Sequence, residues 1–438
     1  MKILVIDPAA SSLDWTMRCI ADGHKVKWVV KNDPKVVHVG KGIVDRIDPS
    51  EIYEWLRWPD LVFFTDNTTY LQVSEFLRKQ GKPVIGPTKE TAEWELDRDV
   101  GMKLMKKAGI EVPPTKEFTD YDTAIAHVKK TMKRYVSKPS GSADKALSYC
   151  SKSPADMIYM LERWKKLSKL KTPFILQEFI PGIEMAVGGW YGSGGFNKGW
   201  CENWEFKKLM NDDKGVATGE QGTVLRCVAK SALAAKVLKP MEDALARAGY
   251  TGYIDVNCII DDKGTPWPLE FTMRPGWPTF NIQQALHTGD HAEWLLDLSE
   301  GKDARNFLLD TIATGVVLSI PDYPYSHLTR KEVVGIPVYG MTEQNKQFIH
   351  PCEMMQGEAP MEVNGKIVTQ PCMVTAGDYV LVTTGTGKTV SQAKCGAYKV
   401  MEQLELPNSP MYRTDIGNRL KKQLPDLQKM GYAAGMTY

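Results

Sequence analysis

The most informative part of this chain is YTGYIDVNCIIDDKGTPWPLEFTMRPGWP, residues 250–278. It contains two apolar runs joined by DDKG at residues 261–264, a turn that is typical of antiparallel strands. We therefore expect a β-hairpin at this place, and the remaining motifs are interpreted around it.

The two strands of this hairpin carry carboxylates on faces that can coincide. Side chains alternate along a strand, so Asp255 shares a face with Asn257, and Glu270 shares one with Thr272. Two converging carboxylates repel each other unless a cation or a proton intervenes. Magnesium suits such oxygen ligands, and Arg274 beyond the second strand could meet a phosphate. The alternative is a surface hairpin with scattered acids.

The bulk composition describes a globular protein of several domains. With 438 residues and 49.1 kDa, the chain is too long for one compact core, so we expect two to four domains. Hydrophobic residues make up 43% and charged residues 25%, which argues against disorder. The 55 basic and 53 acidic residues nearly balance, so charge gives no reason to expect a nucleic-acid or membrane partner.

The cysteines and the N-terminus indicate a reducing compartment. The eight cysteines are scattered, and none has zinc-ligand or C-x-x-C spacing. The apolar run at residues 3–6 is far too short for a signal peptide, and no stretch could span a bilayer. We expect a cytoplasmic protein that is a monomer or a homodimer.

Short apolar runs alternate with helical patterns in the N-terminal third. The runs KILVID, KVKWVV, LVFFTD and KPVIG predict strands, and this alternation is typical of a parallel sheet with crossover helices. Such sheets bind ligands at the carboxyl ends of their strands. The first end, DPAASSLD at residues 7–14, lacks the glycines of a nucleotide loop, although Ser11 or Ser12 could meet an anion.

Helical and strand patterns then alternate to the C-terminus. We expect long helices at residues 90–108 and 229–247 and a last helix at residues 390–403. Short strands fill most of the intervening sequence, so the fold class is mixed α/β and α+β.

Two further segments could contact a nucleotide. Lys138 ends a predicted strand and precedes the small residues 139–143, which could place an ammonium group and backbone amides around phosphates. The apolar strand at residues 174–180 could pair with a purine edge, and Glu184 could hold ribose hydroxyls. Each has an ordinary alternative, because lysines commonly end strands and Glu184 could form a surface salt bridge.

Together, these segments resemble the ATP-grasp superfamily in type and in order. Within it, the chain is most similar to the phosphoribosylamine–glycine ligase (glycinamide ribonucleotide synthetase) family, over nearly its whole length. The likeness rests on GPT at 86–88, Lys138 and its loop, QEFI at 177–180, Glu184, Asp255, Glu270, Arg274, TGVVL at 314–318 and GKTV at 387–390.

The resemblance implies an ATP site. Lys138 would contact the phosphates, and Arg98 would stand where the family has a phosphate-side lysine. Glu184 would bind the ribose. The adenine hinge would comprise Gln177, Glu178, Phe179 and Ile180.

The resemblance also implies a metal centre for Mg²⁺, with Mn²⁺ as an alternative. Glu270 would be a ligand, and Arg274 would stabilise the transferring phosphoryl group or the acyl phosphate. The family has asparagine as its second ligand, whereas this chain has Thr272. A hydroxyl is a weaker ligand, so Asp255 or Asn257 would complete the shell.

The chain departs from the family where the acceptor substrate would bind. Related ligases carry a glycine-rich loop with Arg-Glu-His after the first strand, which helps cradle a sugar phosphate. Here residues 7–14 have no glycine, and Asp7 and Asp14 add negative charge. The acidic segment that follows the family's arginine is PGWPT at 275–279, in which we expect Trp277 to pack within the fold. These changes predict an altered acceptor.

The resemblance implies three domains: a substrate-side α/β domain (1–88), an ATP-grasp domain (89–305) with a smaller lid at about 113–181, and a C-terminal α+β domain (306–438). The loop at residues 139–146 would belong to a mobile lid over the nucleotide.

The implied reaction is ATP-dependent amide formation through an acyl phosphate. The substrates would be a small carboxylate, such as the amino acid glycine, and an amine, and no protein nucleophile is expected. A genuine phosphoribosylamine–glycine ligase of purine biosynthesis is one alternative. A non-catalytic nucleotide-binding regulator is another, although retention of Glu270 with Arg274 argues against it.

Overall fold

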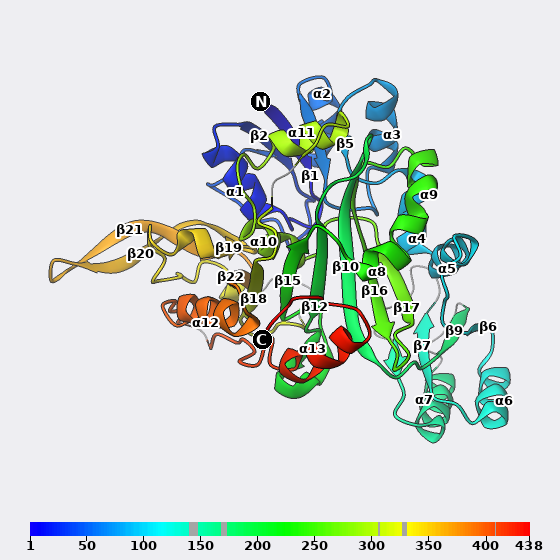
Figure 1. Cartoon of the computed structure of the whole chain (residues 1–438). Helices are drawn as coiled ribbons and strands as arrows, with labels where there is room; N and C mark the ends of the chain where they lie inside the picture. Colours follow the sequence, from blue (N-terminus) through cyan, green and yellow to red (C-terminus); the bar gives the residue numbers. More distant parts are fainter. Residues whose placement is uncertain (140–147, 168–172, 305–306, 326–330, 408) are drawn as a thin grey trace.

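The computed structural model describes residues 1–139, 148–167, 173–304, 307–325, 331–407 and 409–438 (Figure 1). Its N-terminal part is a parallel sheet of strand order β3-β2-β1-β4-β5, which confirms the prediction for this region. The elements are β1 (Lys2–Ile6), α1 (Leu13–Ala21), β2 (Lys25–Val29), β3 (Arg46–Ile47), α2 (Ile52–Trp55), β4 (Leu61–Phe64), α3 (Leu71–Lys79) and β5 (Val84–Ile85).

The helix predicted at residues 90–108 is wrong as a single element. The structure has α4 (Lys89–Leu96) and α5 (Arg98–Lys107), which are separated at Asp97. Asp97 has extended backbone angles, and its side chain accepts hydrogen bonds from the backbone N–H groups of Asp99 and Val100. This N-cap starts a new helix, so Arg98 becomes its first residue.

A small antiparallel sheet of order β6-β9-β7-β8 follows, covered by two helices. Figure 1 shows it set apart from the body of the molecule, below α5. Residues 140–146 of the predicted lid loop lie outside the described residues. The elements are β6 (Thr115–Phe118), α6 (Tyr121–Thr131), β7 (Tyr135–Pro139), β8 (Tyr149–Cys150), α7 (Pro154–Lys166) and β9 (Phe174–Glu178).

The largest sheet has the order β17-β16-β10-β12-β15-β18-β22-β19 and carries the expected hairpin at one edge. It continues from strands before residue 305 into strands after it, and the predicted domain boundaries stay predictions. The strands are β10 (Ile183–Gly192), β12 (Trp200–Glu205), β15 (Gly222–Val228), β16 (Gly252–Ile260), β17 (Pro266–Thr272), β18 (Ile312–Ser319), β19 (Ile349–Pro351) and β22 (Tyr379–Gly387).

Two further helix predictions need correction. The segment predicted as one helix at 229–247 is divided into α8 (Ala232–Val237) and α9 (Glu242–Arg247), with Pro240 between them. The predicted last helix is α12 (Val390–Met401), but α13 (Leu420–Lys429) follows it. The other elements are β11 (Gly195–Phe196), β13 (Lys208–Met210), β14 (Lys214–Ala217), α10 (Thr279–Gln284), α11 (Glu293–Ser299), β20 (Met354–Val363) and β21 (Lys366–Thr375).

Aromatic side chains join the N-terminal sheet to the large sheet. Trp15 of α1 packs against Phe63 of β4, with ring centroids 4.6 Å apart. Phe280 of α10 contacts both of these rings and also Trp190 of β10. The buried α10 therefore fixes the carboxyl ends of the parallel strands beside the large sheet. In the described part of the chain, no helix is long and apolar enough to cross a membrane.

Candidate active site

The hairpin of β16 and β17 brings its polar residues onto one face, as expected. Asp255 pairs with Thr272, and Asn257 pairs directly with Glu270. Cross-strand partners in such a ladder have Cβ atoms about 5 Å apart. These four side chains therefore form one continuous polar patch at the edge of the large sheet.

A cluster of positive charges surrounds Glu270. Arg98 places Nη2 2.7 Å from Glu270 Oε2, and Lys138 and Lys207 also contribute favourable charge. Burial alone would raise the pKa of Glu270, but these three cations hold the pKa at about 2. Glu270 is therefore ionised at neutral pH, as a metal ligand must be.

Lys138 is a nearly buried cation at the end of β7, with 9% of its surface exposed. Burial lowers the pKa of its ammonium group to about 8, against the favourable charge of Glu270. Arg98 and Lys207 lower the pKa further. Because Arg98 and Lys207 repel the ammonium group of Lys138, an anionic ligand would stabilise its charged form, and a polyphosphate would supply that negative charge.

Lys207 completes this cluster, and the sequence analysis did not identify it. Its Nζ lies 2.9 Å from Glu184 Oε1 and 2.9 Å from Glu205 Oε2. Burial opposes its charge, but Glu205 and Glu184 raise the pKa of Lys207 well above its usual value. The signal was the spacing of polar residues along β12 and just beyond its end, where Asn203, Glu205 and Lys207 alternate with aromatic residues.

The donor set of the patch fits a magnesium ion. Asn257 donates Nδ2 to Glu205 Oε2 at 2.8 Å, and its Oδ1 has no hydrogen-bond partner among the described residues. This free oxygen lies beside Glu270 in the ladder. The described residues hold no group of three or more His, Cys, Asp or Glu side chains suited to a metal. Magnesium is usually bound by one or two carboxylates together with substrate phosphates, so two protein ligands suffice.

Asp255 and Thr272 contribute differently to this patch. Asp255 Oδ2 accepts hydrogen bonds from Asn203 Nδ2 at 2.9 Å and from the Tyr253 hydroxyl at 3.2 Å. Burial, with the nearby charge of Glu205, raises the pKa of Asp255 to about 7. The carboxyl group of Asp255 is thus engaged within the protein, and its role as a metal ligand, like that of Thr272, stays a prediction.

Arg274 is held at the start of the segment that follows β17. Its Nη2 lies 3.2 Å from Glu95 Oε1 of α4. Glu95 Oε2 also accepts the backbone N–H of Met273 and Nδ2 of Asn67. Glu95 thus positions Arg274 between the N-terminal sheet and the hairpin, and it was not recognised in the sequence.

The predicted adenine hinge connects the small sheet to β10. The backbone N–H groups of Glu178 and Phe179 donate to the carbonyls of Pro114 and Arg134. The guanidinium of Arg134 lies 3.4 Å from the centroid of the Phe179 ring. Gln177 is buried and Ile180 is partly exposed, and adenine binding by residues 177–180 stays a prediction.

The carboxylate of Asp7 fills the loop between β1 and α1. It accepts hydrogen bonds from the backbone N–H groups of Ser11 and Ser12, at 3.0 and 2.7 Å. The Ser11, Ser12 and Thr65 hydroxyls and Trp28 Nε1 also donate to it. The donors that could meet an external anion in this loop are therefore already used by Asp7.

Two other departures from the family are parts of the fold. Asp14 does not add free charge, because it is buried between Arg18 and His350, at 2.8 and 2.7 Å. Trp277 packs against Tyr379 with ring centroids 4.2 Å apart, so the packing prediction is confirmed.

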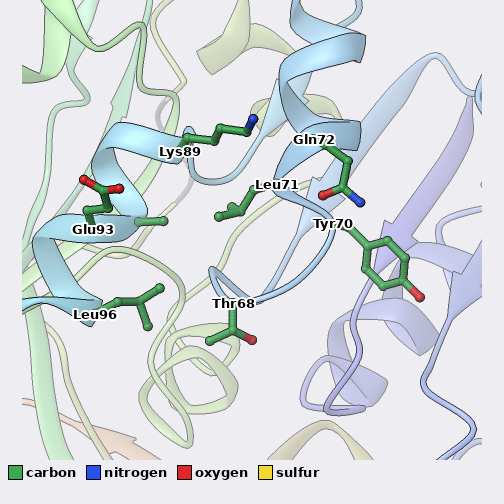
Figure 2. A pocket seen from close by; sticks show the side chains of 8 residues that line it. Thr68, Tyr70, Leu71, Gln72, Lys89, Glu93 and Leu96 are labelled. Atoms are coloured by element: carbon green, nitrogen blue, oxygen red, sulfur yellow. The ribbon is translucent and has the colours of Figure 1, made fainter. Parts of the chain in front are cut away.

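A separate pocket of about 400 Å³ lies between α3 and α4. Figure 2 shows Gln72 and Leu71 from α3 and Lys89 and Glu93 from α4 around it. None of the predicted site residues lines this pocket. It is therefore distinct from the charge cluster around Glu270.

The part of the chain that carries this cluster matches a known family model. Residues 97–279 match the family model described as "Phosphoribosylglycinamide synthetase, ATP-grasp (A) domain". Over 359 aligned residues the chain is 26% identical to a phosphoribosylamine–glycine ligase of Ralstonia nicotianae. The alignment covers 79% of this chain and 81% of the relative. The enzyme class predicted from the sequence, an ATP-dependent C–N ligase, is thus confirmed at the level of the family.

Solved structures confirm the predicted fold class. A phosphoribosylamine–glycine ligase of Thermotoga maritima superimposes with a TM-score of 0.70 at 19% identity, covering 95% of this chain and all of the other. The biotin carboxylase domain of the 2-oxoglutarate carboxylase of Hydrogenobacter thermophilus, in complex with MgADP and bicarbonate, gives 0.62 at 12% identity, covering 93% and 90%.

Proposed function

We propose, on the premise that residues 97–279 form an ATP-grasp domain of the phosphoribosylglycinamide synthetase kind, that the protein is an ATP- and Mg²⁺-dependent ligase. It joins a small carboxylate to an amine through an acyl phosphate. The observation that carries this proposal is the ionised Glu270 with Arg98, Lys138 and Lys207 around it. A protein that only binds a nucleotide does not need an ionised carboxylate such as Glu270 among the cations that face the phosphates.

The side chains have separate tasks in this reaction. When bound, magnesium neutralises the phosphate charge, and Glu270 with the free oxygen of Asn257 would hold it. Lys138 and Arg98 bind the phosphates, and Arg274 stabilises the acyl phosphate. Positioning supplies most of the catalysis, so no protein nucleophile is needed. Mn²⁺ is an alternative metal, and we expect a cytoplasmic location.

The loop between β1 and α1 favours an altered acceptor substrate. In related ligases the corresponding loop helps to cradle a sugar phosphate, whereas here the carboxylate of Asp7 takes its N–H donors. Releasing Asp7 would leave a charged group and six donors without partners, which is costly in a buried place. We infer that the amine substrate carries no phosphate at this position.

ADP formation in the presence of Mg-ATP tests the ligase proposal. The protein is incubated with pairs drawn from amino acids and amines, and an active pair must release ADP only when both members are present. Glu270→Gln keeps the shape of the side chain but removes its charge, so turnover should fall by at least about a hundredfold. Glu293→Gln, an exposed site on α11, should retain full activity.

The alternatives predict other outcomes of the same assay. Robust ADP formation that depends on both glycine and phosphoribosylamine would support a genuine phosphoribosylamine–glycine ligase and contradict the altered acceptor. If no pair gives turnover although Mg-ADP binds, the non-catalytic nucleotide-binding protein gains support.

A further inference from the structure

Glu220 is a buried carboxylate that the reaction described above does not use. It lies between β14 and β15 with 4% of its surface exposed. Its Oε1 is fully enclosed and has no hydrogen-bond partner in the described part of the chain. The backbone here is fixed, because the carbonyl of Glu220 accepts the Tyr379 hydroxyl at 3.4 Å and Gln221 pairs with Phe206.

A second open oxygen shares the neighbour Asp255 with Glu220. Asn203 of β12 is fully buried and donates Nδ2 to Asp255, which leaves its Oδ1 without a donor among the residues that the structure describes. Asp255 also lies close enough to Glu220 for its charge to act there. Glu220 Oε1 and Asn203 Oδ1 are thus both unpaired acceptors, and both residues have Asp255 as a neighbour. A ligand with N–H donors would satisfy these two acceptors.

The charge around Glu220 is predominantly negative. The charged groups that face it are Glu205 and Lys207 at the end of β12, Asp255 of β16 and Glu184 of β10. Burial and the charge of Glu205 raise the pKa of Glu220 well above its usual value, and only Lys207 among these groups opposes them. Glu184 and Glu205 already share Lys207, so no cation remains for Glu220 among these four neighbours.

These observations define the chemistry of the missing partner. It must be positive and must donate hydrogen bonds to the two open acceptors. We propose that Glu220 and Asn203 hold the primary ammonium group of the amine that the ligase couples. This inference rests on the proposed ligase function and adds the charge of the acceptor to it.

The contact also gives the ammonium group a route to its reactive form. A proton moves from nitrogen to Oε1 of Glu220, the electron pair stays on nitrogen, and the neutral amine can then attack the acyl carbon. Phosphate leaves with the electrons of the broken C–O bond and takes up the second proton, which nitrogen loses as the amide forms. Glu220 thus touches the substrate and acts as its base.

Binding of ethylammonium chloride to the full-length protein tests the site. The melting temperature should rise saturably with ethylammonium, because a ligand that binds only the folded state stabilises it. Tetramethylammonium chloride at equal ionic strength is the control, since it has the charge but no N–H donor. Glu220→Gln should weaken ethylammonium binding by about tenfold or more. Glu293→Gln should bind like the wild type.

Three outcomes would overturn the proposal: no saturable response of the wild type, an equal response to tetramethylammonium, or unchanged binding in Glu220→Gln. Mg-ADP affinity is measured on the same samples. Wild-type protein that binds Mg-ADP but not ethylammonium overturns only the ammonium site. Failure to bind Mg-ADP contradicts the proposed function itself.

Discussion

The ionisation of Glu270 links strand pairing to the expected chemistry. Its carboxylate stays charged in a buried place because Arg98, Lys138 and Lys207 lie near it. Lys207 is paired with Glu184 and Glu205. Arg98 and Lys138 nevertheless outnumber Glu270, and their positive charge suits the phosphates of ATP. The sequence identified Arg98, Lys138 and Glu270 through a family likeness. Lys207 belongs to no such motif; the alternation of polar and aromatic residues around it was its only sequence signal, and the structure shows its proximity to Glu184 and Glu205.

The lowered pKa of Lys138 makes nucleotide binding depend on pH. Below a pH of about 8 the free protein carries the ammonium form, which the phosphates require, and above it the neutral amine dominates. Mg-ADP affinity should therefore fall above pH 8, by up to about tenfold per pH unit. Calorimetric titration at several pH values measures this.

Lys138→Gln should bind Mg-ADP weakly and lose that pH dependence. Lys366→Gln, an exposed residue of β21, should keep the wild-type profile. A wild-type affinity that stays constant from pH 7 to well above pH 8 would contradict the charge assigned to Lys138.

Glu220 should reduce stability at neutral pH. Its pKa is raised in the folded protein, so stability falls as pH rises through the usual value of 4.5 toward the folded value. Glu220→Gln cannot ionise, so its free energy of unfolding at pH 8 should be higher than that of the wild type. At a pH below 4.5 residue 220 is neutral in the wild type and in the variant, so denaturant unfolding should give the two proteins the same free energy of unfolding.

At the scale of elements, periodicity predicted the strands well and helix ends less well. Alternation along residues 250–278 predicted which side chains share a face of each strand, and the observed pairing of β16 with β17 brings those faces together. The helix predicted at 90–108 divides because the Asp97 side chain caps α5, a local hydrogen bond that apolar periodicity does not show. The division places Arg98 beside Glu270.

Removing this cap should affect both stability and binding. Asp97→Ala should lower the free energy of unfolding by about 1 kcal/mol. Because Arg98 is the first residue of α5, fraying should also weaken Mg-ADP binding several-fold. Asp120→Ala removes the matching cap of α6, away from Glu270, and should lower stability without changing that affinity. Equal affinity in all three proteins would contradict a positioning role for Asp97.

At the scale of the whole molecule, the site is assembled from three parts of the chain. Arg98 begins α5, Lys138 ends β7 in the small sheet, and Glu270 lies in the edge strand of the large sheet. The sequence predicted the parallel N-terminal sheet and the ATP-grasp likeness. It could not show that Asp7 occupies its own loop, because Thr65 and Trp28, which help to hold it, are distant in sequence.

The transfer of oxygen from the substrate carboxylate to phosphate tests the central claim most directly. With an active pair, a carboxylate labelled with heavy oxygen is incubated with Mg-ATP, and the released phosphate is analysed by mass spectrometry. An acyl phosphate intermediate predicts ADP together with phosphate that carries one labelled oxygen. Unlabelled phosphate, or AMP with pyrophosphate, would contradict the account.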